Sequence, residues 1–335
     1  MGSAITRVLT RHGYNELILA DISEVDLTDQ AAARAFFESA RPQVVVLAAA
    51  KVGGIVANWE RPYEFIAVNL AIELNVIAAA FRVGVEKLIF LGSSCIYPRE
   101  APQPLKEEYL LTGPLEETNR AYAVAKIAGI ELCRSLNREY GTDYLSIMPT
   151  NLYGPGDNFD LRSSHVLPAM IRKFHEAKLG LSGDDGADGA AGAGVPAATA
   201  HSSEASSFPQ APVVLWGSGT PRRELLHVDD LAEAVVFLLE HVAAADVPDG
   251  LINIGTGRDC TVRELAELVQ RVVGHSGPIE WDASKPDGTP QKQLDVSRIT
   301  QLGWRARIDL EEGIRSTYEW YMEHAAGRPA ATSSA

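Results

Sequence analysis

The sequence predicts an α/β fold built on a doubly wound parallel sheet, and three observations support this fold class. Short apolar runs recur along the first half of the chain, and their residues are apolar at consecutive positions, as in strands covered on both faces. Helix-length segments separate these runs, and an alternation of strands and helices favours parallel pairing. The 335 residues are 46% hydrophobic and 22% charged, a composition typical of a globular protein with a sizeable core.

The predicted elements of the first half follow one another in a regular order. The expected strands span 16–20, 44–48, 87–91 and 144–148. The expected helices span about 29–40, 61–82 and 118–140. Ligands of a doubly wound sheet bind beyond the carboxyl ends of its strands, so the residues directly after each apolar run are the candidates for a binding site.

After about residue 160 the pattern becomes less regular. Helices are expected near 165–178, 228–243, 261–273 and 309–324, and strands at 213–216 and 251–254. We therefore expect one domain over 1–160 and a smaller mixed α/β lobe over 161–326, with the active site between them. The stretch 180–212 is rich in Gly, Ala, Ser, Asp and Pro, which predicts a flexible surface insertion, and 327–335 is expected to form a loose tail.

The composition argues against several classes of function. A net charge of −14 disfavours binding to nucleic acid or to an anionic membrane surface. No apolar run approaches the roughly 20 residues that span a bilayer, and the first residues show no secretory signal pattern. The three cysteines are widely spaced without metal-type clustering, so we expect no metal site and a reducing, cytoplasmic location.

A tyrosine and a lysine form the first candidate for catalysis. Tyr122 and Lys126 lie four residues apart in the predicted helix 118–140 and therefore share a face. An ammonium group beside a phenol favours the phenolate, lowers the tyrosine pKa and makes the phenol a usable proton donor near neutral pH. From this spacing alone, an ordinary exposed helix face stays an alternative.

The segment after the strand 87–91 adds a second candidate. It reads Gly92-Ser93-Ser94-Cys95-Ile96-Tyr97-Pro98, which places hydroxyl groups at the carboxyl end of a central strand. A bound carbonyl group can accept hydrogen bonds from hydroxyls at that position.

With these residues the sequence resembles the extended short-chain dehydrogenase/reductases, which implies a Rossmann-type fold. Two further segments carry this resemblance, 223–230 and 253–257. Within that group the chain resembles the GDP-L-fucose synthase family. The blocks that carry this closer resemblance are 48–55, 92–98, 148–155, 216–221 and 282–290, and together they extend over nearly the whole chain except the insertion and the tail.

The resemblance implies an enzyme that converts GDP-4-keto-6-deoxy-D-mannose to GDP-L-fucose by 3,5-epimerisation and NADPH-dependent reduction of the C4 ketone. It implies that Tyr122 donates a proton to the C4 oxygen, that Ser93 hydrogen-bonds this oxygen, and that Lys126 holds the nicotinamide ribose and tunes Tyr122. It also implies that Cys95 and His165 are the acid/base pair that inverts C3 and C5. These roles are chemically consistent, because protons next to the ketone are acidic and the donors used in reduction can also stabilise the enolate.

Taken singly, two of these residues have plainer interpretations. Cys95 can be a packed small residue, although a nearby positive group would favour the thiolate needed for a base. His165 can be structural, although it opens the predicted helix 165–178. We assign no chemistry to Cys133 and Cys260.

The resemblance also implies the binding residues. For the cofactor NADP(H) they are Gly2, Ala49, Ala50, Leu91, Gly92, Ser93, Ser94, Lys126, Pro149, Thr150, Asn151, Leu152 and His165. For the GDP-sugar they are Lys173, Trp216, Arg223 and Asp287. Lys173 and Arg223 supply positive charge for the diphosphate, and Trp216 offers a face for stacking, with core packing as its alternative.

The sequence departs from the family pattern at two places. The family begins with a strand and a Gly-x-x-Gly-x-x-Gly turn at the cofactor pyrophosphate, whereas Met1-Gly2-Ser3 corresponds only to the last glycine and the following helix. We expect that the sequence starts inside a longer protein, the other possibility being poor cofactor binding. Asp21 follows the expected strand 16–20 where the family tends to have a basic residue, and it favours NADH by accepting from a ribose 2′-hydroxyl.

Two other interpretations of the function stay open. One is a different nucleotide-sugar epimerase, dehydratase or reductase of the same fold. The other is a truncated, cofactor-deficient chain that acts as a non-catalytic subunit. The resemblance further implies a homodimer formed through the helices near 61–82 and 118–140.

Overall fold

The computed structural model describes residues 1–161, 163–181, 210–285, 287–324 and 326. Its main sheet has the strand order β1-β2-β3-β7, and every neighbouring pair is parallel. These strands span Val44–Leu47, Lys87–Leu91, Asp143–Pro149 and Leu251–Ile254. Strands β2 and β3 are buried along nearly their whole length, which explains why their sequences are continuously apolar.

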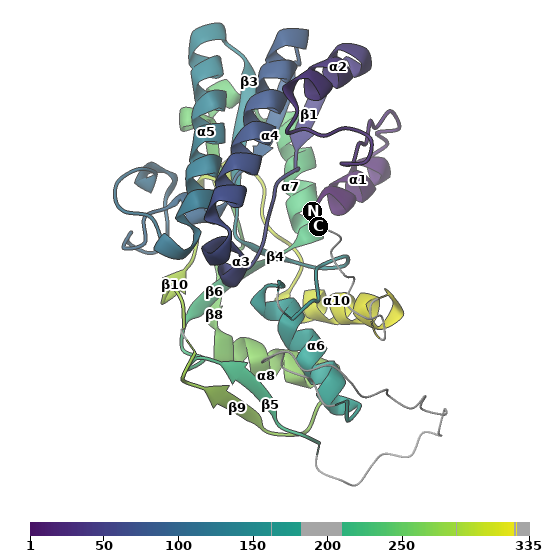
Figure 1. Ribbon diagram of the computed structural model, residues 1–335, viewed down its shortest axis with the longest axis vertical. Helices are drawn as coiled ribbons and strands as arrows, with labels where there is room; N and C mark the ends of the chain where they lie inside the picture. The colour runs from purple at the N-terminus through teal and green to yellow at the C-terminus, as the bar shows by residue number, and fades with distance from the viewer. Residues whose placement is uncertain (162, 182–209, 286, 325, 327–335) are drawn as a thin grey trace.

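Helices cover both faces of this sheet (Figure 1). Leu88 and Phe90 of β2 join one apolar core with α2, α4 and α5, whereas Ile89 and Leu91 join a second core with α1 and α7. The two cores on opposite faces confirm the doubly wound α/β class. The helices span Gly2–Arg11 (α1), Gln30–Ala40 (α2), Pro62–Val83 (α4), Arg120–Tyr140 (α5) and Val228–His241 (α7).

The run 16–20, predicted as a strand, is not one, and this prediction is wrong. Ile18 and Leu19 are 53% and 63% exposed, and the run has no strand assignment. The reason is the lack of a neighbour: among the described strands, β1 pairs only with β2, so no strand lies beside this run. A lone extended segment cannot satisfy its backbone N–H and C=O groups within the protein.

Two elements expected in the smaller lobe belong instead to the main sheet layer. The strand predicted at 251–254 forms β7, which pairs with β3, and the helix predicted at 228–243 forms α7, which packs against α1. Their apolar residues complete the core on that face of the sheet. The chain thus returns to the first layer after leaving it near residue 160.

The remaining elements form a second region, seen in the lower half of Figure 1. One sheet has the order β10-β6-β4 with β8 beside β6, and β5 pairs with β9. These strands span Asn151–Tyr153 (β4), Val213–Trp216 (β5), Arg222–His227 (β6), Asp259–Thr261 (β8), Ile279–Asp282 (β9) and Gln291–Lys292 (β10). The helices here span Val166–Lys178 (α6), Val262–Val273 (α8) and Leu310–His324 (α10), and they share a core with β5.

Two short helices complete the described fold, Ile55–Glu60 (α3) and Ser297–Leu302 (α9). The helices predicted near 29–40, 61–82, 118–140, 165–178, 261–273 and 309–324 are all present. Most of the predicted insertion, from 182 to 209, and the whole predicted tail lie outside the described residues.

Helix α4 is long and apolar enough, by length and composition alone, to cross a membrane. Here it packs against α2 and α5 within the layered fold, and it buries Asn69, Glu73 and Asn75. Buried polar side chains are typical of a helix that packs inside a protein, because a lipid environment penalises them.

Candidate active site

The end of β2 places Ser93 at the edge of the main sheet. Gly92 donates its N–H to the Ile147 carbonyl at 2.8 Å, and a Cβ at Gly92 would lie 2.9 Å from the Met148 sulfur. Only glycine therefore fits this close strand contact. Ser93 then accepts a hydrogen bond from the Cys95 N–H at 3.3 Å, which caps a 3₁₀ turn over Ser94–Ile96.

Tyr122 and Lys126 lie one helical turn apart on α5 and face this strand end. The Lys126 Nζ lies 5.9 Å from the centre of the Tyr122 ring and donates to the Leu91 carbonyl at 3.0 Å. Burial raises the pKa of Tyr122, the charges of Cys95 and Glu73 act in the same direction, and a hydrogen bond with Ser93 opposes them. Contrary to the expectation from the sequence, Lys126 is not among the groups that lower the pKa of Tyr122.

The reason is that Lys126 already has a carboxylate partner. Glu73 of α4 forms an ion pair with it, with 3.2 Å between Nζ and Oε1, and the two side chains are 2% and 1% exposed. Burial lowers the pKa of Lys126, and Glu73 opposes that change. Much of the lysine charge is thus balanced before it acts on Tyr122.

Cys95 has two nitrogen donors beside its sulfur. The Asn119 Nδ2 lies 3.2 Å from Sγ and the Lys292 Nζ lies 3.3 Å from it. Asn119 directly precedes α5, and Lys292 comes from β10. Both nitrogens can donate hydrogen bonds to this sulfur.

His165 caps the N-terminus of α6 and is exposed to solvent. Its charge interacts with Asp157, a largely buried carboxyl whose pKa burial raises. The segment before it lies close to the loop after β1, because a Cβ at Gly54 would be 3.6 Å from the carbonyl oxygens of Ser163 and Ser164. The structure gives no contact between His165 and Cys95.

The residues expected to bind the GDP-sugar gather around the end of β5. Trp216 is the last residue of β5 and is 58% exposed, which argues against core packing. Lys173 donates to the Val214 carbonyl at 3.0 Å from α6. Arg223 donates to the Thr289 carbonyl at 2.7 Å and reaches the Asp287 carbonyl at 3.5 Å.

Asp287 organises the turn beside Trp216. Its carboxylate accepts from the Ser218 N–H at 2.6 Å and from the Ser218 hydroxyl at 2.8 Å. These hydrogen bonds hold the pKa of Asp287 below its usual value. Gly217 has φ of +80°, and a Cβ there would overlap the Asp287 carboxylate, so glycine is required in this turn.

A short ladder connects this group of residues to the strand-end group. In the parallel pair of β6 and β10, Arg223 lies opposite Lys292. Arg223 belongs to the group around Trp216, whereas Lys292 contacts the Cys95 sulfur. The pairing thus places the backbones of Arg223 and Lys292 side by side, and the Lys292 side chain extends from there to the Cys95 sulfur.

The residues expected to hold the cofactor follow the carboxyl ends of parallel strands. Ala49 and Ala50 come after β1, 91–94 lie at the end of β2, and 149–152 lie at the end of β3. Asn69 holds the first of these loops, because it accepts from the Lys51 N–H at 2.8 Å and donates to the Lys51 carbonyl at 3.0 Å. This edge of the sheet fits the nicotinamide end of a dinucleotide.

Two of the cofactor predictions concern the other end of the dinucleotide. Gly2 begins α1, and a Cβ at this position would meet nothing within 4 Å, so the helix start is open on that side. Asp21 is exposed and accepts hydrogen bonds from the Ser23 N–H at 2.7 Å and the Ser23 hydroxyl at 2.6 Å.

Sequence reasoning missed Glu73, Asn119 and Lys292. A signal for Glu73 was present, since a carboxylate in a largely apolar helix is unusual and calls for a partner. Lys292 and Asn119 carry no such signal, because only the fold brings 95, 119 and 292 together. Among the described residues, no group of three or more His, Cys, Asp or Glu side chains is suited to hold a metal ion.

A strand-end serine beside a tyrosine–lysine pair, over a doubly wound parallel sheet, defines a nicotinamide-dependent enzyme of the Rossmann type. The chain belongs to the NAD dependent epimerase/dehydratase family, whose model matches residues 1–255. It is 51% identical over 329 residues to a GDP-L-fucose synthase of Escherichia coli (strain K12), covering 97% of this chain and 94% of that protein. It is 50% identical over 325 residues to a probable GDP-L-fucose synthase 1 of Oryza sativa subsp. japonica, covering 97% and 89%.

A solved structure supports the same fold. It is MlghC, a GDP-mannoheptose C4 reductase from Campylobacter jejuni with NADP bound. The TM-score is 0.82 at 36% sequence identity, and the match covers 96% of this chain and 94% of that one.

Proposed function

We propose that this protein converts GDP-4-keto-6-deoxy-D-mannose to GDP-L-fucose by epimerisation at C3 and C5 and NADPH-dependent reduction at C4. The relatives at about 50% identity over nearly the whole chain support this activity. The observation that carries it is the Cys95 sulfur, held by Asn119 and Lys292 close to Ser93 and Tyr122. A simple ketone reductase has no need of a supported thiol at this position.

The epimerisation relies on the acidity of the protons at C3 and C5, which both neighbour the C4 ketone. Inversion requires removal of a proton from one face of the sugar and its return to the other face, so two acid/base groups are needed. We assign these roles to Cys95 and His165. The negative charge of the enolate develops on the C4 oxygen, where the Ser93 and Tyr122 hydroxyls can donate hydrogen bonds.

The reduction uses the same oxygen. NADPH, when bound, supplies the hydride that adds to C4. Tyr122 then donates its proton to the oxygen, Ser93 orients that oxygen, and Lys126 is placed to hold the ribose and supply positive charge. The residues at the ends of β1, β2 and β3 hold the nicotinamide end, and Gly2 at the start of α1 contributes to the pyrophosphate end.

The test is incubation with GDP-4-keto-6-deoxy-D-mannose and NADPH, with GDP-L-fucose as the measured product. In deuterated water, the wild-type protein is expected to incorporate deuterium at C3 and C5. Cys95→Ala with His165→Ala in one chain is expected to abolish this incorporation. Full incorporation by that double variant would refute the assignment of the pair.

A second candidate activity is reduction of a different GDP-4-keto sugar without epimerisation. The similarity to the GDP-mannoheptose C4 reductase favours it. The deuterium experiment separates the two activities, because reduction alone places no solvent deuterium at C3 or C5.

Measuring cofactor binding distinguishes an active enzyme from a non-catalytic subunit. We expect saturable binding of NADPH, with weaker binding of NADH despite Asp21, since the similar reductase was solved with NADP. Lack of saturable binding to either nucleotide would favour the non-catalytic subunit.

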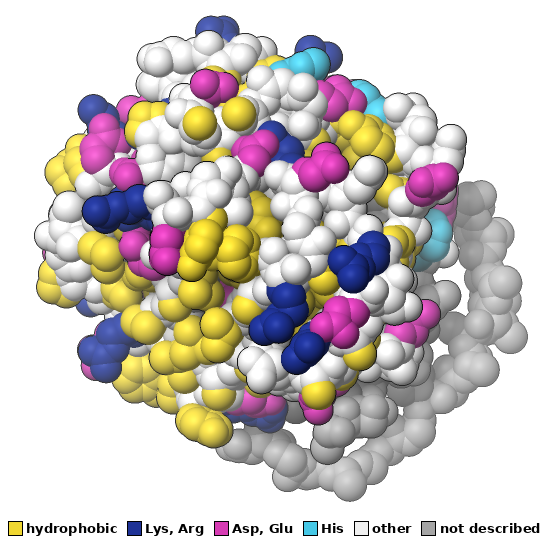
Figure 2. Space-filling model, turned by 90° about the horizontal axis from the view of Figure 1, so that it is seen from above, with side chains coloured by type: hydrophobic (Ala, Val, Ile, Leu, Met, Phe, Trp, Pro, Cys, Tyr) yellow, Lys and Arg dark blue, Asp and Glu magenta, His cyan; other side chains and the backbone are white. Residues whose placement is uncertain are grey.

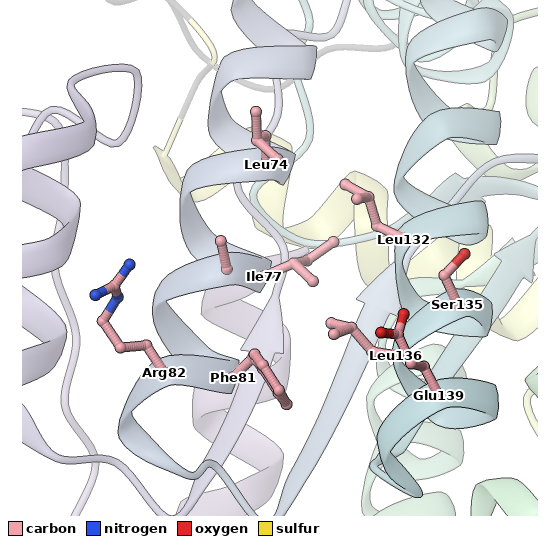
Figure 3. A pocket seen from close by; sticks show the side chains of 9 residues that line it. Leu74, Ile77, Phe81, Arg82, Leu132, Ser135, Leu136 and Glu139 are labelled. Carbon is pink, nitrogen blue, oxygen red and sulfur yellow. The ribbon is translucent and has the colours of Figure 1, made fainter.

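We infer that the protein is a homodimer formed through α4 and α5. An apolar groove runs between these helices and is lined by Leu74, Ile77, Phe81, Leu132 and Leu136 (Figure 3). Figure 2 shows hydrophobic side chains gathered on the side where α4 and α5 lie. A second copy of the chain is the partner that the resemblance implies, and two such grooves facing each other would bury their apolar walls.

Light scattering after size exclusion tests the dimer. Leu74 is 49% exposed in the groove, and Leu74→Glu is expected to give a monomer of half the mass because it buries charge at the interface. Leu19→Glu is the matched control, since Leu19 is exposed away from α4 and α5. A wild-type protein that is monomeric at tens of micromolar would contradict the inference.

The cellular location belongs to the same proposal. Cys95, Cys133 and Cys260 are all unpaired in the structure, which supports a reducing compartment and a cytoplasmic protein. Cys133 is buried and burial raises its pKa to about 12, so it has no role in proton transfer near neutral pH.

A further inference from the structure

Glu73 occupies an unusual place for a carboxylate. It lies in the middle of α4, its side chain is 1% exposed, and its Oε1 is 3.2 Å from the Lys126 Nζ. Apart from the Lys126 ammonium, neither carboxylate oxygen has a hydrogen-bond partner of good geometry among the described residues. A buried carboxylate that lacks its usual hydrogen bonds costs stability, so its presence calls for an explanation.

The fold makes room for this contact at one glycine. A Cβ at Gly129 would lie 2.5 Å from the Phe90 ring and 2.9 Å from the Glu73 Oε2. Glycine at this position lets α5 approach both α4 and β2. Phe90 lies beneath the ammonium, with 4.7 Å from the Lys126 Nζ to the ring centre.

We propose that Glu73 is a positioning residue of the reduction site, which fixes the Lys126 ammonium between α4 and the Leu91 carbonyl and balances its charge. The lysine ammonium has three N–H donors, of which one meets Leu91 and a second points to the Glu73 carboxylate. The third is left for the side of Tyr122 and the ribose. This inference rests on the proposed function, because it assigns Lys126 to the reduction.

The position of Glu73 also makes the balance of charge depend on pH. Burial raises the pKa of Glu73 to about 7, with Lys126 opposing the change. The titratable groups that interact with Glu73 are Lys126, Tyr122 and Cys133, all on α5. Ionised Glu73 neutralises Lys126 and makes Tyr122 a weaker acid, whereas protonated Glu73 leaves the lysine charge free to act on the phenol.

Glu73 lies beneath a groove between α4 and α5 that Leu70, Leu74 and Leu132 also line, and its own side chain is only 1% exposed.

The test compares the wild-type protein with Glu73→Gln over pH 5.5 to 9, with NADPH oxidation as the readout. We expect kcat to fall about tenfold in Glu73→Gln, because the ammonium loses the carboxylate that positions it and this loss outweighs the freed lysine charge. KM for the sugar nucleotide is expected to change less than about twofold, and the inflection of kcat near pH 7 to vanish. Glu73→Asp keeps the charge and is expected to retain the inflection with an intermediate kcat. Glu38→Gln is the control, because Glu38 is an exposed helix carboxylate paired with Arg34.

A folded Glu73→Gln variant with the wild-type kcat and the wild-type inflection would overturn the proposal. A wild-type protein without turnover would instead contradict the proposed function. In that case, the pH dependence of thermal unfolding tests the role of Glu73. Because the folded protein keeps a proton on Glu73 that the unfolded chain loses above its ordinary pKa of 4.5, this group's contribution to stability falls as pH rises towards about 7.

The difference in Tm between the wild-type protein and Glu73→Gln is therefore expected to shrink or change sign between pH 5 and 7, and to level off above pH 7.5. A pH-independent difference would overturn the proposal. If Glu73→Gln does not fold, Glu73→Asp serves for the same comparison, with a displaced midpoint as the expected result and an unchanged profile as the contradicting one.

Discussion

Lys292 illustrates how much of a reactive group's environment comes from distant residues. Its ammonium lies 3.3 Å from the Cys95 sulfur, although the two residues are 197 positions apart in the sequence. The sequence predicted Cys95 as an acid/base group in need of a nearby positive charge, but it did not identify that charge. The pairing of β10 with β6 and the bridge between Leu105 and Leu294 bring Lys292 to this place.

Lys292→Met tests this contact. The substitution removes the ammonium and keeps most of the side chain's length. It is expected to slow deuterium exchange at C3 and C5 by about 10²-fold, because Cys95 loses the positive group beside its sulfur. Reduction of a ketone that needs no epimerisation is expected to change much less. NMR of the sugar measures the exchange, Lys106→Met at an exposed site is the control, and an unchanged exchange rate would exclude a role for Lys292.

Arg223 offers a second test at the scale of single residues. Its guanidinium donates to backbone carbonyls of the 287–289 loop, and a lysine cannot reproduce this forked geometry. Arg223→Lys is expected to raise KM for the GDP-sugar about tenfold with kcat within about threefold. The neighbouring Arg222→Lys, whose native partner is Asp259, is the control, and equal KM values in both variants would contradict a substrate role for Arg223.

Among the elements, α4 and α5 pack against each other and carry Glu73, Tyr122 and Lys126. Gly129→Ala is expected to destabilise the protein by about 1–3 kcal/mol, because the added methyl group would overlap the Phe90 ring and the Glu73 carboxylate. Chemical denaturation measures this change. Arg138→Gln at an exposed position of α5 is expected to stay within about 0.5 kcal/mol of the wild-type protein.

A further element-scale prediction concerns Glu224, which is 0% exposed. Its carboxylate accepts from the backbone N–H groups of Thr256 at 2.6 Å, Gly257 at 2.8 Å and Leu294 at 2.6 Å. Glu224→Gln replaces one acceptor oxygen by an NH₂ group that faces a donor, so a loss of about 2–4 kcal/mol of stability is expected. Denaturation curves within about 0.5 kcal/mol of the wild-type curve would contradict this account.

The elements also show where sequence patterns are reliable. Strands β2 and β3 were predictable because burial on both faces requires apolar residues at every position. The run 16–20 has the same pattern but no neighbouring strand, and a local pattern carries no information on neighbours. For the same reason the pattern identified 251–254 as a strand without revealing that it pairs with β3.

At the scale of the whole molecule, the sequence predicted the class of fold correctly, and it named candidate site residues without the contacts that join them. Ser93, Tyr122 and Lys126 could be found because each stands at a strand end or on a helix face of known spacing. Glu73, Asn119 and Lys292 act through contacts across the layers, and those contacts depend on the way the helices and sheets pack together.

The pairing of β6 with β10 has a consequence for the length of the substrate. Arg223 lies opposite Lys292 in this pairing, so the side chain proposed to bind the diphosphate and the side chain beside the Cys95 sulfur belong to the same pair of residues in the ladder. On the proposed roles, a nucleotide sugar with one phosphate fewer is expected to react more slowly, because it lacks a phosphate that Arg223 would contact while its ketone must still reach Cys95 and Tyr122.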